Sequence, residues 1–320
     1  MLAALQRLVV RHGVGACRGR WAERTGRGPV NPSIHALLIP DRDFSTLLSE
    51  VRWLEQIGVP TVWVDDHFAH PVDPRRSWLD AWSALAGWAA TTERIGLGTL
   101  VSNPVLRSPA VLARQALSVE HISGGRLELG LGAGYAASDH DAAGVPSWSA
   151  TERAARFASC VVTVDAVLRG DSARSADASE LPVLAPRPTR TPRPPLTIAA
   201  HSAGSLALAA RYGDRWISYG GFGLSAEEHR RVTAARLAGL EEACGRIGRD
   251  PATIRRALLI GSAATTPTPM WQSLDSARRL IDSYSAMGID EFVLYYPPQA
   301  VWPAGAVQPE VFERLIEAYR

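Results

Sequence analysis

The feature that most constrains the fold is a regular alternation of short apolar runs and longer amphipathic segments between residues 33 and 320. Each short run fits a buried strand, and each longer segment repeats apolar residues at helical spacing. The expected strands span 34–39, 61–64, 95–101, 127–131, 196–200, 215–218, 254–261 and 292–296. The expected helices span 43–57, 78–92, 108–122, 151–168, 225–247, 274–287 and 309–320, with one more beginning at Ala203. Eight strand–helix units favour a closed (β/α)8 barrel, the TIM-barrel form of the α/β class, over an open doubly wound sheet.

Two segments fall outside this alternation. Residues 1–32 precede the first strand, and residues 1–30 contain six Arg and one acid, Glu23, for a charge of +5. We expect 1–32 to be a disordered basic extension, with a transit peptide as the alternative, and 33–320 to be one barrel domain. Six prolines between Pro182 and Pro195 interrupt regular structure. Residues 171–195 are therefore expected to form a Pro-rich surface insertion without regular structure.

Charge and composition exclude several classes of function. Beyond the basic extension, 28 Arg face 31 acidic residues, a net charge of −3, so this part of the chain is not expected to bind nucleic acid. All 34 basic residues are Arg, which excludes a Schiff-base lysine and a Walker-type phosphate loop. No apolar run approaches the roughly 18 residues of a membrane span, so no transmembrane helix is expected.

Three cysteines, Cys17, Cys160 and Cys244, are far apart and form no C-x-x-C pair. This spacing favours neither a disulfide framework nor a zinc cluster, and it is typical of a reducing, cytoplasmic protein.

In a (β/α)8 barrel the chemistry lies at the carboxyl ends of the strands, and this rule selects the candidate residues. Asp65, Asp66 and His67 follow the second strand, and His201 follows the fifth. A carboxylate next to an imidazole can orient it and raise its basicity, so Asp66 and His67 predict an acid–base pair. A purely structural Asp-His dipeptide is the alternative, because neighbours in sequence need not touch.

A glycine-rich run follows the fourth strand. Gly132-x-Gly134-x-x-Ala137 fits a dinucleotide-binding fingerprint, but that motif belongs after the first strand of an open sheet, with a helix starting at once. Here Pro146 precedes the next expected helix. The glycines are therefore interpreted as places where the backbone approaches a ligand closely.

Six segments in this order resemble the luciferase-like monooxygenase family. They are VWVDDH at 62–67, RIGLGTLV at 94–101, SGGRLELGLGAG at 123–134, PLTIAA at 195–200, ARYGDRW at 210–216 and GIDEFVLYY at 288–296. The resemblance covers about residues 33–320. It implies a (β/α)8 barrel that binds FMN or the deazaflavin coenzyme F-420.

The resemblance also implies roles for matched positions. His67, with Asp66, would stand over the reactive face of the cofactor ring and handle a proton during hydride transfer. Leu100 and Val101 match a pair that forms a non-proline cis peptide behind the ring in many members, whereas an ordinary core strand is the alternative. The remaining cofactor contacts would come from Ser102, Ala133, Gly134, Tyr135, Ser138, His201 and Ser202, the last two near the cofactor phosphate.

Three positions depart from the deazaflavin sugar-phosphate dehydrogenases of this family. Tyr135 stands where they use a glutamate, His70-Pro71 occupies the place of a tryptophan, and His201-Ser202 replaces adjacent glycines. Substrate and acid–base details of that subgroup are therefore not transferred. The Asp-His pair and the Gly-Leu-Gly-Ala-Gly-Tyr run still favour the deazaflavin branch over FMN.

We therefore expect a cytoplasmic oxidoreductase that transfers hydride between coenzyme F-420 and a small organic substrate. The main alternative is an FMN-dependent two-component monooxygenase that acts with molecular oxygen and a reductase partner. A metal-dependent barrel hydrolase and a non-catalytic cofactor-binding protein are further alternatives, the hydrolase using Asp65, His67 and His70 or Asp139, His140 and Asp141. No metal, nucleic acid or membrane is expected as a partner. The oligomeric state is left open between a monomer and a homodimer, since dimers are common in the family.

Overall fold

The structure is a computed structural model, and it describes most of the chain after the basic extension. The described residues are 31–71, 73–171, 173–174, 180–266, 268–301, 303, 305–308 and 310–320. Of the extension expected to be disordered, residues 1–32, all but the last two residues lie outside this range. Residues Pro32–Arg320 form one compact unit, and it is this unit that is described below.

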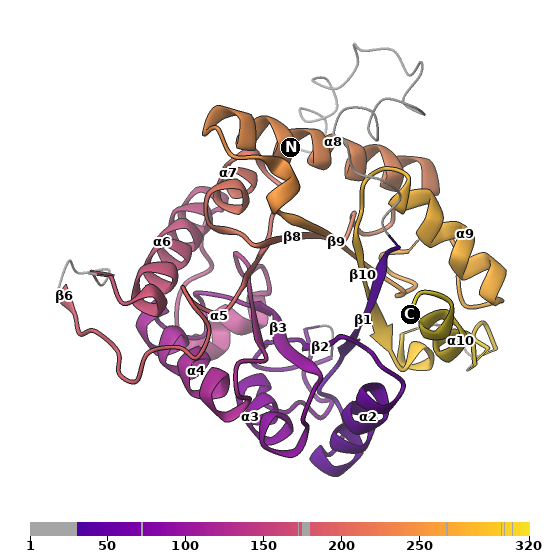
Figure 1. Ribbon diagram of the computed structural model, residues 1–320, viewed down its shortest axis with the longest axis horizontal. Coiled ribbons are helices and arrows are strands. Elements are labelled where there is room, and N and C mark those ends of the chain that lie inside the picture. Colours follow the sequence, from indigo (N-terminus) through magenta and orange to yellow (C-terminus); the bar gives the residue numbers. More distant parts are fainter. Residues whose placement is uncertain are drawn as a thin grey trace. The chain divides into compact units, whose positions relative to one another are not determined.

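Eight parallel strands close into a barrel in the order β1-β10-β9-β8-β7-β4-β3-β2, which confirms the expected fold (Figure 1). The barrel strands are β1 (Ser33–Leu38), β2 (Thr61–Val64), β3 (Gly96–Ser102), β4 (Leu127–Leu131), β7 (Leu196–Ala199), β8 (Arg215–Ser218), β9 (Arg255–Ile260) and β10 (Glu291–Tyr296). The helices are α2 (Phe44–Gln56), α3 (Ala81–Thr91), α4 (Pro109–Ile122), α5 (Ala137–Ala143), α6 (Ala150–Arg169), α7 (Ala203–Tyr212), α8 (Ala226–Arg246), α9 (Leu274–Ser285) and α10 (Glu310–Ala318). Each strand pairs in parallel with both neighbours, so all eight carboxyl ends open on one rim.

Helix starts on this rim are fixed by short polar side chains. Asp43, Asp80 and Ser108 each accept a hydrogen bond from a backbone N–H in the first turn of α2, α3 and α4. Ser149 caps α6 with its partner Glu152 in a reciprocal capping box. These caps satisfy N–H groups that a helix leaves unpaired, and they set where each loop of the rim ends.

The barrel interior is closed at its lower end, where the strands begin. A small apolar cluster that includes Leu37, Trp63 and Leu100 fills the centre, separate from the larger core between strands and helices. Below it, Arg215 is 1% exposed and donates hydrogen bonds to Glu291 and Glu128. With a plugged interior, a ligand can enter only from the rim at the carboxyl ends of the strands.

Two parts of the chain differ from the expectation. The Pro-rich insertion contains a two-stranded antiparallel ribbon, β5 (Ala173–Arg174) and β6 (Glu180–Leu181), where no regular structure was expected. The loop after β4, also expected to be irregular, contains the short helix α5. The far end of the insertion is held by Arg193, which is 5% exposed and pairs with Asp165 and Asp214.

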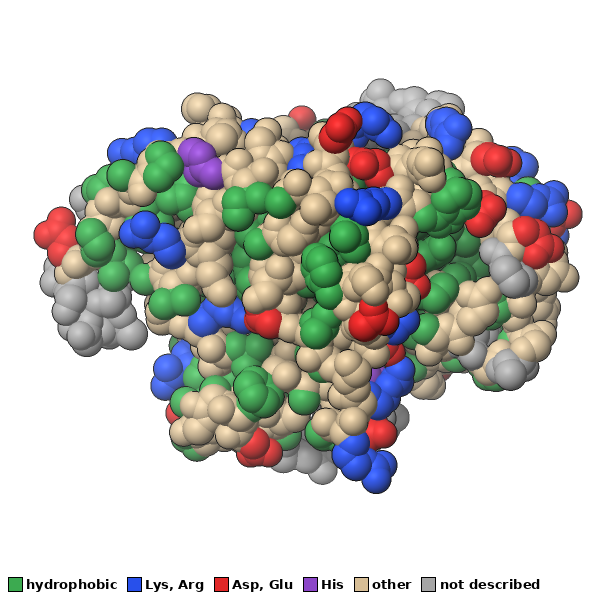
Figure 2. Space-filling view, turned by 90° about the horizontal axis from the view of Figure 1, so that it is seen from below, with side chains coloured by type: hydrophobic (Ala, Val, Ile, Leu, Met, Phe, Trp, Pro, Cys, Tyr) green, Lys and Arg blue, Asp and Glu red, His purple; other side chains and the backbone are tan. Residues whose placement is uncertain are grey.

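The outer surface mixes polar and apolar side chains. Figure 2 shows the side of the barrel covered by α2, α3 and α4, where apolar side chains lie between charged ones. The large apolar side chains exposed on α2 and α4 are Phe44, Trp53, Val111 and Ile122. Within the described residues, the structure has no helix with the length and hydropathy needed to cross a bilayer.

Candidate active site

Asp66 is the most firmly held side chain at the end of β2. It is 1% exposed, and Arg107 grips both oxygens of its carboxylate, with 3.0 Å between Arg107 Nη2 and Asp66 Oδ1. Ser102 Oγ also donates to Asp66 Oδ2, and Trp82 Nε1 donates to the same oxygen at 3.2 Å. A bidentate, buried pair of this kind fixes geometry. Asp66 therefore anchors the β2 loop to β3 and α3 and has no oxygen turned to His67.

The carboxylate that orients His67 is Asp139 on α5, which corrects our expectation of Asp66. His67 Nδ1 lies 2.8 Å from Asp139 Oδ2, and the backbone N–H of Phe68 donates to Asp139 Oδ1 at 3.0 Å. Asp139 is fully buried, whereas 13% of the His67 side chain is exposed. Because a carboxylate can only accept, Nδ1 carries the proton and Nε2 is the nitrogen left for a ligand.

The charge of His67 is controlled by its neighbours. Burial opposes the charged imidazolium, but the hydrogen bond that His67 donates to Asp139 and the charges of Asp65, Asp139 and Asp66 outweigh it and raise the pKa of His67. A raised pKa extends the charged form of His67 to higher pH than in an ordinary histidine. His67 can therefore donate a hydrogen bond or a proton from Nε2 to a bound oxygen atom.

Two aromatic residues stand next to His67. The Tyr135 ring meets the imidazole edge to face with 5.9 Å between centroids, and Trp78 lies 6.3 Å away. Trp78 Nε1 also donates to the backbone oxygen of His67 at 2.8 Å. A tryptophan thus contacts His67 from 11 residues further along the chain, although His70-Pro71 occupies the position where the family pattern has one.

The peptide bond between Leu100 and Val101 is cis, as the resemblance implied. The register of β3 against β4 shifts between Thr99 and Ser102, so the chain bulges here. Leu100 and Val101 both pack against the central apolar cluster at the rim. The side chain of Ser102 is fully buried and is used by Asp66 and Trp82, so its hydroxyl supports the β2 loop instead of facing a ligand.

The loop after β4 brings the backbone close to Val101. A Cβ atom added to Gly132 would lie 2.3 Å from Val101 Cγ2, and Gly134 has a φ of +70° that favours glycine. Tyr135 follows and is 64% exposed. In the same loop, Ser138 Oγ is buried and forms no hydrogen bond within the described part of the chain. The loop therefore offers close backbone, an accessible phenol and an unpaired hydroxyl on one side of the rim.

His201 and Ser202 lie at the end of β7, where α7 begins. Ser202 caps α7 through Ser205, so its side chain serves the helix start. His201 stacks edge to face on Tyr219 with 4.7 Å between centroids, and its Nε2 is buried with no hydrogen-bond partner among the described residues. Burial, with a smaller effect of Arg236, lowers the pKa of His201 to about 4. His201 is therefore a neutral imidazole near pH 7 that can accept or donate one hydrogen bond to a ligand.

The structure brings most of the predicted residues to one rim and adds others. His67, Leu100, Val101, Ala133, Gly134, Tyr135, Ser138, His201 and Ser202 all lie at or just after strand ends. Sequence reasoning considered Asp139 only as a ligand of the alternative metal site and did not consider Arg107; the roles of both depend on contacts with residues far away in sequence. Among the described residues, no three His, Cys, Asp or Glu side chains are grouped to hold a metal ion.

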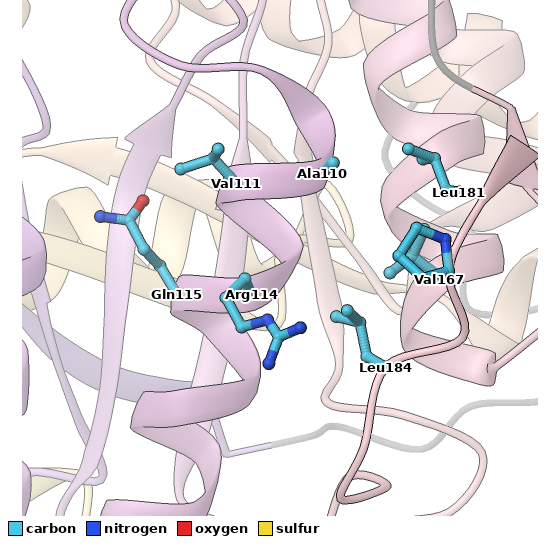
Figure 3. Close-up of a pocket in the computed structure, with 8 residues that line it drawn as sticks. Ala110, Val111, Arg114, Gln115, Val167, Leu181 and Leu184 are labelled. Carbon is cyan, nitrogen blue, oxygen red and sulfur yellow. The ribbon is translucent and has the colours of Figure 1, made fainter. Parts of the chain in front are cut away.

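A cavity of about 300 Å³ on the outside of the barrel contains none of these residues (Figure 3). It lies between α4, the end of α6 and the segment after β6, and its lining includes Val111, Val167 and Leu184. The candidate site is therefore the rim at the strand ends.

Known proteins are similar to this chain in sequence and in fold. The sequence pattern of the luciferase-like monooxygenases matches residues 25–304. An F420-dependent hydroxymycolic acid dehydrogenase from Mycobacterium tuberculosis is 28% identical over 92% of this chain and 88% of its own. A 4-hydroxyprotoasukamycin monooxygenase from Streptomyces nodosus subsp. asukaensis is 33% identical over 54% of this chain and 46% of its own.

A solved structure of an F420-dependent secondary alcohol dehydrogenase, in complex with an F420-acetone adduct, has the same fold. The two structures superpose with a TM-score of 0.71 at 18% identity, covering 90% of this chain and 99% of that one. The family pattern covers most of the chain, including every residue of the rim described above. The chain belongs to the luciferase-like monooxygenase family.

Proposed function

We propose that the protein is an oxidoreductase that transfers hydride between the deazaflavin coenzyme F-420 and a small organic substrate. The observation that carries the proposal is the His67–Asp139 pair on the open rim, beside the cis peptide of Leu100 and Val101. The long match to an F420-dependent dehydrogenase supports the deazaflavin over other cofactors.

The residues of the rim fit such a cofactor. A planar ring needs an apolar backing, which Leu100 and Val101 can give from the central cluster. Ser138 Oγ and His201 Nε2 are buried polar atoms without partners among the described residues, and a bound polar ligand would satisfy them. The start of α7 beside His201 offers backbone N–H groups, which favour a phosphate.

The chain itself positions the substrate and controls a proton. When bound, the deazaflavin accepts or donates the hydride. His67, charged through its contact with Asp139, donates a hydrogen bond from Nε2 to the substrate oxygen and stabilises negative charge that develops there. The pair of Asp66 and Arg107 holds the loop that carries His67, so the imidazole is placed before the substrate arrives.

An FMN-dependent monooxygenase is the second candidate, and the match to a named monooxygenase over half of the chain supports it. In that case reduced flavin would react with oxygen, and the protein would need a reductase partner.

A homodimer is part of the proposal because exposed apolar side chains on α2 and α4 offer a face for a second copy (Figure 2). The buried free thiols of Cys160 and Cys244 support a reducing, cytoplasmic location.

The test is a reduction assay with coenzyme F-420 and a panel of primary and secondary alcohols, with wild type and His67→Ala side by side. We expect wild type to reduce the deazaflavin with at least one alcohol. His67→Ala should bind the cofactor with similar affinity but turn over much more slowly, because it loses the donor to the substrate oxygen. Equal turnover of the two proteins at saturating substrate would remove His67 from the mechanism.

A further inference from the structure

Asp65 stands inside the mouth of the barrel, which follows from the alternation of side chains along β2. Trp63 belongs to the central apolar cluster, so the side chain two residues further on points to the same side. The same rule places Tyr295 above Val293 of that cluster on β10. Asp65 and Tyr295 thus form part of the polar layer on top of the apolar plug, at the floor of the rim site.

No structural contact explains Asp65. The neighbouring carboxylates are fully used, since Asp66 is held by Arg107 and Asp139 holds His67. Asp65, by contrast, forms no hydrogen bond and no ion pair with any residue in the described part of the chain. A partly buried carboxylate without partners opposes folding, so a side chain of this kind at a ligand-binding rim points to a function.

The charged and titratable groups around Asp65 come from several elements of the rim. They are His67 and Asp66 on the β2 loop, Asp139 on α5, Tyr135 after β4 and Tyr295 on β10. Burial is the main influence and, with the two carboxylates, raises the pKa of Asp65 to about 6, although His67 acts in the opposite direction. Above that pH the carboxylate is ionised and can take a proton from a ligand.

We propose that Asp65 is the group that accepts the hydroxyl proton of the substrate, and that the substrate is an uncharged alcohol. This step rests on the proposed function. As the alcohol is oxidised, its carbinol C–H bond breaks and hydrogen leaves with both electrons as hydride to the deazaflavin. The O–H bond breaks, its proton passes to the Asp65 carboxylate, and the C=O double bond forms.

The two groups on the rim then have different tasks. His67 holds the substrate oxygen as a hydrogen-bond donor, and Asp65 removes the proton from the same oxygen. A phosphorylated or carboxylated substrate placed close to Asp65 would meet a like charge, so the site selects neutral alcohols. Alcohol oxidation requires ionised Asp65 and charged His67, which predicts a bell-shaped pH profile.

The first test uses the protein without cofactor. Infrared spectra of protein labelled with ¹³C-aspartate are recorded against pH for wild type, Asp65→Asn and the control Asp141→Asn, which changes an exposed acid on α5. We expect a carboxylic-acid band that titrates near pH 6 in wild type and the control and is absent in Asp65→Asn. We also expect Asp65→Asn to raise the melting temperature, because it removes an unpaired charge that is partly buried. All Asp bands titrating near the ordinary value of about 4 would overturn the proposal.

The second test uses the protein with coenzyme F-420 and an alcohol that wild type oxidises. Asp65→Asn should bind the cofactor like wild type, lose the acidic limb of the pH profile and turn over about 100-fold more slowly. An unchanged rate and profile would overturn the role of Asp65. If wild type neither binds nor reduces the deazaflavin, the proposed function fails, and the infrared titration still decides whether Asp65 is a neutral-range acid.

Discussion

Replacing Asp139 by Asn tests how the site controls His67. The carboxylate of Asp139 accepts two hydrogen bonds, one from His67 Nδ1 at 2.8 Å and one from the Phe68 backbone at 3.0 Å. An amide has no charge and only one oxygen, so the charged interaction with the imidazolium is lost and one of the two donors loses its acceptor. The side chain keeps its size, so packing around α5 is expected to stay the same.

The size of the effect follows from burial. Asp139 is fully buried, and a hydrogen bond to a charged group in such a place contributes about 1.5–3 kcal/mol. Since one pKa unit corresponds to about 1.4 kcal/mol, the pKa of His67 should fall by about 1 to 2 units. The same loss of stabilisation in the transition state would slow turnover about 10- to 150-fold.

The assay is a pH titration of ¹⁵N-labelled histidine by NMR, with Asp141→Asn as the matched control on the same helix. In wild type and the control, His67 should titrate above the ordinary value of about 6.5. In Asp139→Asn the midpoint should fall, and the alkaline limb of the activity profile should move down with it. If the His67 midpoint in Asp139→Asn stays within about 0.3 pH units of wild type, the view that Asp139 controls the charge of His67 is refuted.

The remaining predictions concern the glycine loop and the lower end of the barrel. Gly132→Ala places a Cβ within 2.3 Å of Val101 Cγ2, so it should lower the free energy of urea unfolding by about 1–3 kcal/mol and weaken cofactor binding. The control Gly245→Ala adds a Cβ to open space on α8 and should leave stability unchanged or increase it. Arg215→Met removes the buried cation between Glu128 and Glu291, which keep longer contacts with Arg255 at 3.4 and 3.6 Å, and it should cost about 3 kcal/mol in the same assay; a loss below about 1 kcal/mol would contradict this. Burial, with two nearby Arg, lowers the pKa of His35 to about 4 in the folded state. Above pH 6.5 the imidazole is neutral in both states, but as the pH falls from 6.5 toward 4 only the unfolded state binds the proton, so the free energy of unfolding decreases over this range. His35→Asn should reduce this loss by about 3 kcal/mol in unfolding curves measured across that range, and identical pH dependence of the two proteins would contradict the reasoning.

The barrel could be predicted from sequence because its signal is local and repeated. Eight short apolar runs alternate with helical periodicity, and strand ends are visible where polar residues or glycines begin. Helix α5 gave no such signal because it has seven mostly polar or small residues, and the N-cap residue before it, Ala136, has no side chain that can cap it. The β5–β6 ribbon escaped because its strands have two residues each, too few for any period.

The partners within the site could be predicted less well. The position of His67 at a strand end was visible, but its carboxylate lies 72 residues away on α5. Adjacent residues after a strand turn to opposite sides, so Asp66 faces Arg107 and β3 while its neighbours face the mouth. Long-range pairing of this kind depends on the closed barrel, which brings the loops after β2 and β4 together.

Measuring which cofactor the protein binds tests the central claim most directly. Purified protein, freed of any bound cofactor, is titrated with coenzyme F-420 and with FMN in parallel, and binding is followed by fluorescence. The account predicts tighter binding of the deazaflavin, weakened in Gly132→Ala and retained in His67→Ala. Preferential binding of FMN would contradict it and favour the two-component monooxygenase. If neither binds below about 1 mM, roughly −4 kcal/mol, the proposed function is wrong.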